Sequence, residues 1–242
     1  MSLWQFANPN YFMSWSQKLI PIFGLLALVS ILVGFVWGLF FTPDDFVQGS
    51  AVKIMFVHVP SAFLAINIYL MMFVASLVWL IRRHHVSALA AKAAAPIGVI
   101  MTIIAICTGA LWGKPMWGTA WVWDPRLTSF ALMLFFYFAY IAVWNAVGTN
   151  DRAADMTSIL CLVGSVFALL SRYAVFFWDQ GLHQGSSLSL DKEEHVSNHF
   201  FFPLLVSMIG FVLLFLTLLL IRTQTEIRKR RIESILSQSS MR

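Results

Sequence analysis

Residues 112–128 carry Trp112, Trp117, Trp121 and Trp123 within one short stretch. A tryptophan at a membrane boundary normally anchors a helix, with its ring among the acyl chains and its N–H toward water, and one or two at each boundary are usual. The Gly and Pro residues of the stretch argue against one continuous helix. The sequence therefore predicts a loop whose indoles form a platform for a flat, hydrophobic ligand.

Histidines and cations occur near this stretch in the sequence. His58 precedes a long apolar run, with Pro60 in the expected first turn of a helix, and His183 lies in a later polar segment. Lys114, Arg126 and Arg172 supply positive charge around the tryptophans.

Asp124 and Pro125 end the Trp-rich stretch. An Asp before a Pro is typical of a helix start, where the carboxylate accepts a backbone N–H and the missing N–H of proline costs little. Helix capping is thus the simplest role for Asp124.

Three kinds of ligand fit these residue types to different degrees. A metal ion alone leaves the tryptophans unexplained, and no Cys or carboxylate stands at a ligand spacing from the histidines. A polar solute on a transport path calls for ionisable or helix-breaking residues at mid-membrane, which are scarce here. Haem fits best: its ring stacks on indoles, its iron accepts neutral imidazole, and its propionates pair with cations such as Lys114, Arg126 or Arg172. Because the chain has no Cys-x-x-Cys-His motif, the haem is expected to be haem b, held non-covalently.

The elements that position these residues are membrane helices. The 242-residue chain is 60% hydrophobic and only 11% charged, against about 25% charged residues in an ordinary soluble domain. Six stretches are long and apolar enough to cross a bilayer, which predicts an all-α integral membrane protein, a bundle of six transmembrane helices. The expected spans are 19–41, 59–81, 91–111, 127–149, 156–178 and 200–221. The first has no basic segment before it and no cleavage site after it, so it is not expected to be a signal peptide.

The distribution of Lys and Arg predicts the orientation of the bundle. One side receives eleven of these residues, namely Lys18, Arg82, Arg83, Lys92, Arg152, Arg222, Arg228, Lys229, Arg230, Arg231 and Arg242. The other side receives Lys53, Lys114, Arg126 and Lys192, with Arg172 near the end of the fifth span. Both termini are therefore expected to be cytoplasmic, with the Trp-rich loop on the periplasmic side. The net charge of +5 reflects this asymmetry and does not indicate nucleic-acid binding.

The chain divides into three expected regions. Residues 1–18 form an interfacial segment, residues 19–221 the transmembrane domain, and residues 222–242 a basic cytoplasmic tail. The tail is expected to contain a basic helix that rests on anionic headgroups or on a partner subunit.

The remaining cysteines and histidines are assigned no chemistry. Cys107 and Cys161 lie inside expected spans as packing residues, and His84 and His85 are expected on the surface. His195 and His199 are expected in a solvated loop, with contact with haem or a protein partner as the alternative.

The sequence resembles a known family. Trp-Gly-Thr-Ala-Trp-Val-Trp-Asp-Pro-Arg-Leu-Thr at 117–128 looks like the tryptophan-rich WWD motif of haem-handling proteins. Trp-Gly-Lys-Pro-Met before it, His58 in His-Val-Pro-Ser-Ala and His183 in Leu-His-Gln-Gly-Ser resemble the six-span CcmC branch, which serves cytochrome c maturation. The similarity runs from the first span to the sixth.

The resemblance implies a function and a site. It implies a bacterial inner-membrane protein, not an enzyme, that holds haem on its periplasmic face with His58 and His183 as axial ligands. The platform would comprise Trp112, Trp117, Trp121 and Trp123 with Asp124. The implied partners are the haem chaperone CcmE, which would receive the haem, and CcmA, CcmB and CcmD of an ABC-type complex, within membrane lipid.

Two positions depart from the family pattern. Ala120 stands where a further Trp is usual, and Arg172 stands where some relatives carry a histidine. The competing hypotheses are a membrane haem redox protein and a solute transporter with a Trp-rich outer gate.

Overall fold

Six long helices make up the structure, a computed structural model that describes residues 8–148, 150–177 and 197–239. They are α1 Pro9–Phe40, α2 Met55–Arg82, α3 His85–Trp117, α4 Pro125–Val147, α5 Asp151–Phe177 and α6 Asn198–Ser239, with a short 3-10 helix, η2 Ser50–Ile54, before α2. All six are long and apolar enough to cross a membrane. Each predicted span lies on one helix to within two residues, so the predicted six-helix membrane bundle is confirmed.

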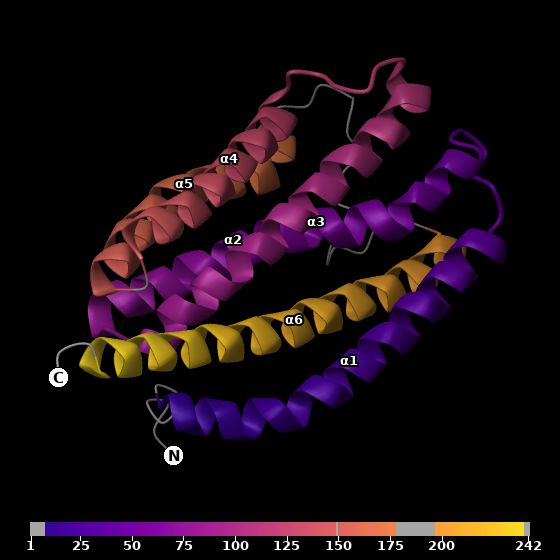
Figure 1. Cartoon of the computed structure of the whole chain (residues 1–242). Coiled ribbons are helices and arrows are strands. Elements are labelled where there is room, and N and C mark those ends of the chain that lie inside the picture. The colour runs from indigo at the N-terminus through magenta and orange to yellow at the C-terminus, as the bar shows by residue number, and fades with distance from the viewer. Residues whose placement is uncertain (1–7, 149, 178–196, 240–242) are drawn as a thin grey trace.

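The helices pack as three neighbouring pairs (Figure 1). Helices α1 and α6 run along one another, α2 and α3 form a second pair, and α4 and α5 form a third. The start of α1 and the end of α6 lie at the same end of the bundle. This agrees with an even number of crossings, while the assignment of that end to the cytoplasm stays a prediction.

The outer pair of helices extends beyond the expected spans. Helix α1 begins at Pro9, where the Asn8 side chain accepts the backbone N–H of Asn10 at 2.9 Å, and it continues without a break into the first span. Helix α6 continues past Ile221 to Ser239. The expected region boundaries at residues 18 and 222 therefore fall within continuous helices, and the division into regions stays a prediction.

The turn between α2 and α3 depends on a histidine. Arg83 adopts a left-handed conformation (φ 52°), which ends α2, and the His84 ring accepts the backbone N–H of Ser87 at 3.0 Å to cap α3. An imidazole that accepts this bond is neutral, and partial burial lowers the pKa of His84 below its ordinary value. His85 is exposed as predicted, whereas the half-buried His84 has a capping role that the sequence did not indicate.

Small residues allow α1 and α6 to approach closely. A Cβ added to Gly34 would lie 2.8 Å from the backbone nitrogen of Ser207, and one added to Gly210 would lie 2.8 Å from the nitrogen of Ile31. Backbone atoms this close cannot yield as a flexible side chain can. Membrane helices commonly associate through such small residues, because lipid supplies no hydrophobic force between them.

Replacing Gly34 by Val should therefore destabilise the α1–α6 contact. Overpacking typically costs about 1–3 kcal/mol, so we expect a lower thermal unfolding temperature for the purified protein in detergent. Gly24→Val is the matched control on the same helix, because its Cβ would meet the Thr217 methyl at an ordinary 3.5 Å. Equal unfolding temperatures for the two variants would contradict close packing at Gly34.

Candidate functional site

The Trp-rich stretch is partly helical. Helix α3 continues through Gly113 and Pro115 to Trp117, so the prediction of a loop from Trp112 onward is wrong for its first six residues. A proline removes only one helical hydrogen bond, and the helix ends two residues later at Trp117, followed by Gly118, whose φ of 75° suits glycine. The true connection is residues 118–124, which runs from the end of α3 to the start of α4 (Figure 1). The four tryptophans thus come from a helix end and a loop.

Trp112 joins the end of α3 to the start of α2. Its indole Nε1–H donates to Gln48 Oε1 at 2.9 Å, and its ring meets the His58 ring edge-on, with centroids 5.7 Å apart and planes at 81°. The structure therefore brings one of the predicted platform tryptophans into contact with His58, while their predicted roles toward haem stay predictions.

His58 lies in the first turn of α2 and is half-buried. The helix begins at Met55, four residues earlier than the predicted span, and η2 leads into it. Pro60 therefore lies in the second turn, so its predicted place in the first turn is wrong. The earlier helix start holds His58 on rigid backbone.

The contacts of His58 determine which ring nitrogen carries its proton. The Thr108 hydroxyl is 2.6 Å from the Ile104 carbonyl oxygen and donates its one hydrogen there. The same hydroxyl oxygen lies 3.1 Å from His58 Nδ1, so it accepts the Nδ1–H. The neutral ring then has its lone pair on Nε2, the nitrogen that a metal binds.

Gly109 leaves the space that the imidazole occupies. A Cβ at this position would lie 2.9 Å from His58 Cε1. Because any larger residue would push the ring aside, α3 fixes both the position and the tautomer of His58.

The loop tryptophans form a pair. The Trp121 and Trp123 rings meet edge-on with centroids 5.6 Å apart, and the Thr119 hydroxyl donates to the Trp121 carbonyl at 3.0 Å to hold the loop. Trp123 is 78% exposed. The Trp121 Nε1–H is enclosed and has no acceptor among the described residues, which suits a site where a ligand supplies one.

Trp117 lies at the last position of α3, where its ring packs on Gly113: a Cβ there would lie 2.9 Å from the indole Cε3. It is half-buried. Trp117 therefore connects the helix end to the loop that carries the other two indoles.

Asp124 caps α4, as predicted. Its carboxylate accepts the Leu127 N–H at 2.6 Å, Pro125 follows at the first helical position, and the residue is only 4% exposed. A buried carboxylate held by a helix start is a structural group, and it fixes the point where the loop enters α4.

The three cations predicted to meet the propionates differ in placement. Arg126 is half-buried. The charges of Asp124 and Arg172 both act on its guanidinium group. Arg172 is exposed near the end of α5, and Lys114 is exposed on the last turn of α3. The structure thus places Arg126 of α4 and Arg172 of α5 within electrostatic range of one another, and Lys114 lies on a third helix, α3.

Two predicted histidines lie outside the described residues, namely His183 and His195. His199 is exposed in the first turn of α6. Within residues 8–148, 150–177 and 197–239, no group of three His, Cys, Asp or Glu could hold a metal ion. The pairing of His58 and His183 on one iron stays a prediction.

Sequence reasoning missed Gln48, Thr108 and Gly109. Thr108 and Gly109 are ordinary residues of an apolar span, 50 and 51 positions from His58. No local pattern marks such a long-range contact, since it depends on how α3 packs against α2.

Comparisons with known proteins show which family and which relatives the chain is similar to. The family model described as CcmC, heme exporter protein C, matches residues 2–238. Proteins named heme exporter protein C include one from Rhodobacter capsulatus, 59% identical over 241 residues and covering 100% of both chains. The one from Paracoccus denitrificans is 60% identical over 240 residues, covering 99% of both chains. The one from Escherichia coli is 40% identical over 215 residues, covering 88% of this chain and 86% of its own.

Proposed function

Because this chain belongs to the heme exporter protein C family, we propose that it binds haem at the periplasmic end of its bundle and delivers it during cytochrome c maturation. The haem is cargo, held non-covalently as haem b, and the protein acts as a scaffold without bond chemistry of its own. The observation that carries the proposal is the His58 ring, which lies edge-on to Trp112 and has the Thr108 hydroxyl 3.1 Å from its Nδ1.

The surroundings of His58 support a haem ligand rather than a bare metal ion. Trp112 lies against the imidazole, and Trp121 and Trp123 lie in the loop that follows α3. Indoles bind a porphyrin through their faces and edges, whereas a metal ion alone would need a cluster of ligands. The residues around His58 therefore fit haem as the cargo.

The charges near the loop support recognition of propionates. Arg126 and Arg172 place two guanidinium groups near one another, and guanidinium binds carboxylate through paired hydrogen bonds. The enclosed Trp121 Nε1–H is a further donor for which a propionate oxygen would be a suitable acceptor.

The finer parts of the proposal concern the second ligand and the partners. His183 is proposed as the other axial ligand, with CcmE as the recipient and CcmA, CcmB and CcmD as members of the complex. Two imidazoles hold iron firmly, so release requires that the chaperone bind haem more tightly than both histidines do.

Transfer of haem tests the function directly. The purified full-length protein, loaded with haem, is mixed with the soluble domain of the chaperone, and the haem that becomes covalently attached to the chaperone is measured. We expect transfer from this protein and not from free haem at the same concentration. Vectorial flux into liposomes without partners would favour a solute transporter, and quinol-dependent reduction with turnover would favour a redox protein.

Thr108 offers a milder test of the ligand geometry. Thr108→Val removes the acceptor for His58 Nδ1–H and should lower haem affinity roughly tenfold, the usual effect of losing a hydrogen-bond partner of a metal ligand. Thr108→Ser keeps the hydroxyl and is the matched control. Haem titration followed by absorbance measures both, and equal affinities for Val and Ser would contradict the assigned tautomer.

A further inference from the structure

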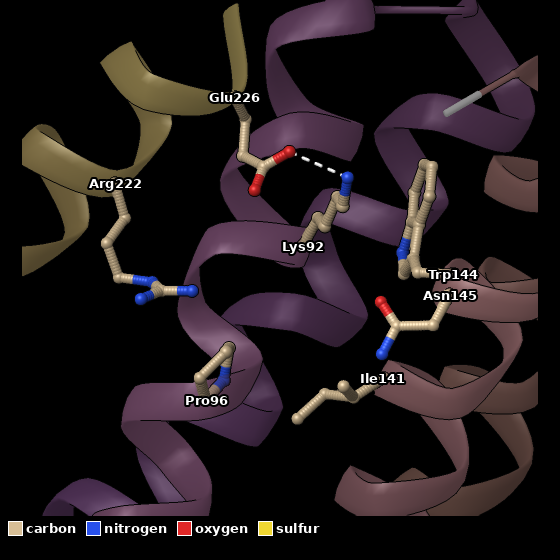
Figure 2. Close-up of a pocket in the computed structure, with 7 residues that line it drawn as sticks. All are labelled: Lys92, Pro96, Ile141, Trp144, Asn145, Arg222 and Glu226. Carbon is tan, nitrogen blue, oxygen red and sulfur yellow. Dashed lines mark ion pairs between the residues drawn. The ribbon is translucent and has the colours of Figure 1, made fainter. Parts of the chain in front are cut away.

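A second polar site lies at the opposite end of the bundle from the Trp-rich loop. A cavity of about 90 Å³ is lined by Lys92 and Pro96 of α3, Ile141, Trp144 and Asn145 of α4, and Arg222 and Glu226 of α6. Figure 2 shows α4 and α6 contributing opposite walls, with the α3 residues between them. None of these residues has a part in the haem proposal.

Two of the charges in the cavity neutralise one another. Lys92 Nζ lies 2.6 Å from Glu226 Oε2, and the two side chains are only 12% and 15% exposed. The same ammonium group lies 4.9 Å from the centre of the Trp144 ring (Figure 2). A shielded ion pair of this kind leaves the third charge, Arg222, to set the net charge of the cavity at +1.

Arg222 is held in place from one side only. Its Nε–H donates to the Ala93 carbonyl at 3.0 Å. Pro96 lies one turn further along α3 and has no N–H for the Lys92 carbonyl. Among the residues that the structure describes, no carboxylate forms an ion pair with Arg222. Its guanidinium lines the cavity without a carboxylate partner from the described part of the chain.

The position of the cavity, at the end of the apolar part of α6, indicates which kind of ligand it suits. Arg222 directly follows the apolar part of α6, which ends at Ile221, and the basic run Arg228–Arg231 continues away from it. Arg222 therefore lies at the depth where phospholipid phosphates are found. Basic pockets between membrane helices bind anionic headgroups, and the volume is well below the roughly 300–1,000 Å³ of sites for drug-sized ligands.

We propose that this cavity binds the phosphate of an anionic phospholipid, with Arg222 as its charged contact and Asn145 as a polar neighbour. Arginine binds phosphate through two parallel hydrogen bonds, which suits a guanidinium already oriented by Ala93. The headgroup would fill the space between α4 and α6 and so link two helix pairs through lipid.

Binding of phosphatidylglycerol to the purified full-length protein tests the proposal. The delipidated protein in non-ionic detergent is titrated with this lipid, and bound lipid is counted by native mass spectrometry. Arg222→Gln should weaken binding by roughly tenfold or more, as for loss of charge-assisted hydrogen bonds. Arg228→Gln removes the same charge from a residue of α6 that is exposed like Arg222 but does not line the cavity, and it should weaken binding by less than about fivefold, the effect of one surface charge.

Two further variants separate binding from folding. Arg222→Lys keeps the charge and should retain most of the affinity, because lysine also binds phosphate. Glu226→Gln removes the nearby negative charge and should raise affinity roughly fivefold, a gain that an unfolded protein could not show. The second variant tests the proposal even if Arg222→Gln does not fold.

Three results would overturn the proposal. Equal losses for Arg222→Gln and Arg228→Gln would show diffuse attraction to the basic helix. Equal binding of phosphatidylcholine, whose phosphate is balanced by a choline cation, would show that the cavity does not select a lipid of net negative charge. Displacement of the lipid by inorganic phosphate, with the same dependence on Arg222, would assign the cavity to a soluble anion.

Discussion

His58→Gly should reduce the haem that binds to the purified protein by roughly tenfold or more. Loss of a residue that binds the iron directly should lower affinity more than loss of the hydrogen-bond partner that orients it. The remaining haem should lose the optical spectrum of iron held by two imidazoles. Added imidazole should restore that spectrum, because the variant leaves a space beside Gly109 where the ring lay. Chemical rescue distinguishes a lost ligand from a lost fold.

The control for this experiment is a histidine at the other end of the bundle. His85→Gln also removes an imidazole, but His85 lies near Asp151 and Arg230, far from the Trp-rich loop. It should leave the spectrum unchanged. His183→Ala should resemble His58→Gly, and retention of the two-imidazole spectrum in both variants would reject the assignment of the axial ligands.

The order of the helices was predictable from the sequence because each span is a long apolar run. Such runs require no knowledge of packing, since the bilayer sets their length and every backbone group must be bonded within the helix. Even so, the ends of the helices were not well predicted. A basic helix was predicted after Ile221, but as part of a separate tail, whereas helix α6 runs without a break through residues 222–239 because Lys, Arg and Glu are good helix formers outside the membrane.

The helical form of Trp112 and Trp117 was missed for a similar reason. Gly113 and Pro115 were interpreted as helix breakers, yet a membrane helix accepts them when neighbours compensate for lost hydrogen bonds. Here Trp117 packs against Gly113, so the glycine provides room for an indole. The sequence composition alone could not show whether Gly113 ends the helix or makes room for a neighbouring side chain.

The site residues also differ in whether the sequence could predict them. His58, the tryptophans and the cap at Asp124 were predicted because each residue type suggests its own role. Thr108, which sets the tautomer of His58, was not, because a threonine in a membrane span usually bonds to its own helix. Thr108 does both, and only the contact between α2 and α3 reveals the second bond.

The two ends of the bundle suit different ligands. Beside the Trp-rich loop, indoles and one oriented imidazole suit a flat ligand with a metal. At the other end, Arg222 and the Lys92–Glu226 pair suit a small anionic group. Helix α3 contributes to both ends, with Lys92 near its start and Thr108 near its finish. Lipid bound at one end would therefore stabilise the helix that orients His58.

Trp123→Ala should slow transfer of haem to the chaperone roughly threefold to tenfold, as expected for loss of one aromatic contact. The Trp123 ring is 78% exposed and meets Trp121 at its edge, so its removal should leave thermal stability and membrane insertion unchanged. Transfer is measured as covalently attached haem on the purified chaperone over time.

Trp37→Ala is the comparison variant, because Trp37 is an exposed tryptophan outside the Trp-rich stretch, near the end of α1, with 41% of its surface accessible against 78% for Trp123. If the tryptophans are only a membrane belt, both variants should impair insertion and neither should affect transfer selectively. If Trp123 is part of a haem platform, only its loss should slow transfer. Slower transfer in Trp123→Ala alone, with insertion unchanged in both variants, would therefore support a contact between Trp123 and haem or the chaperone.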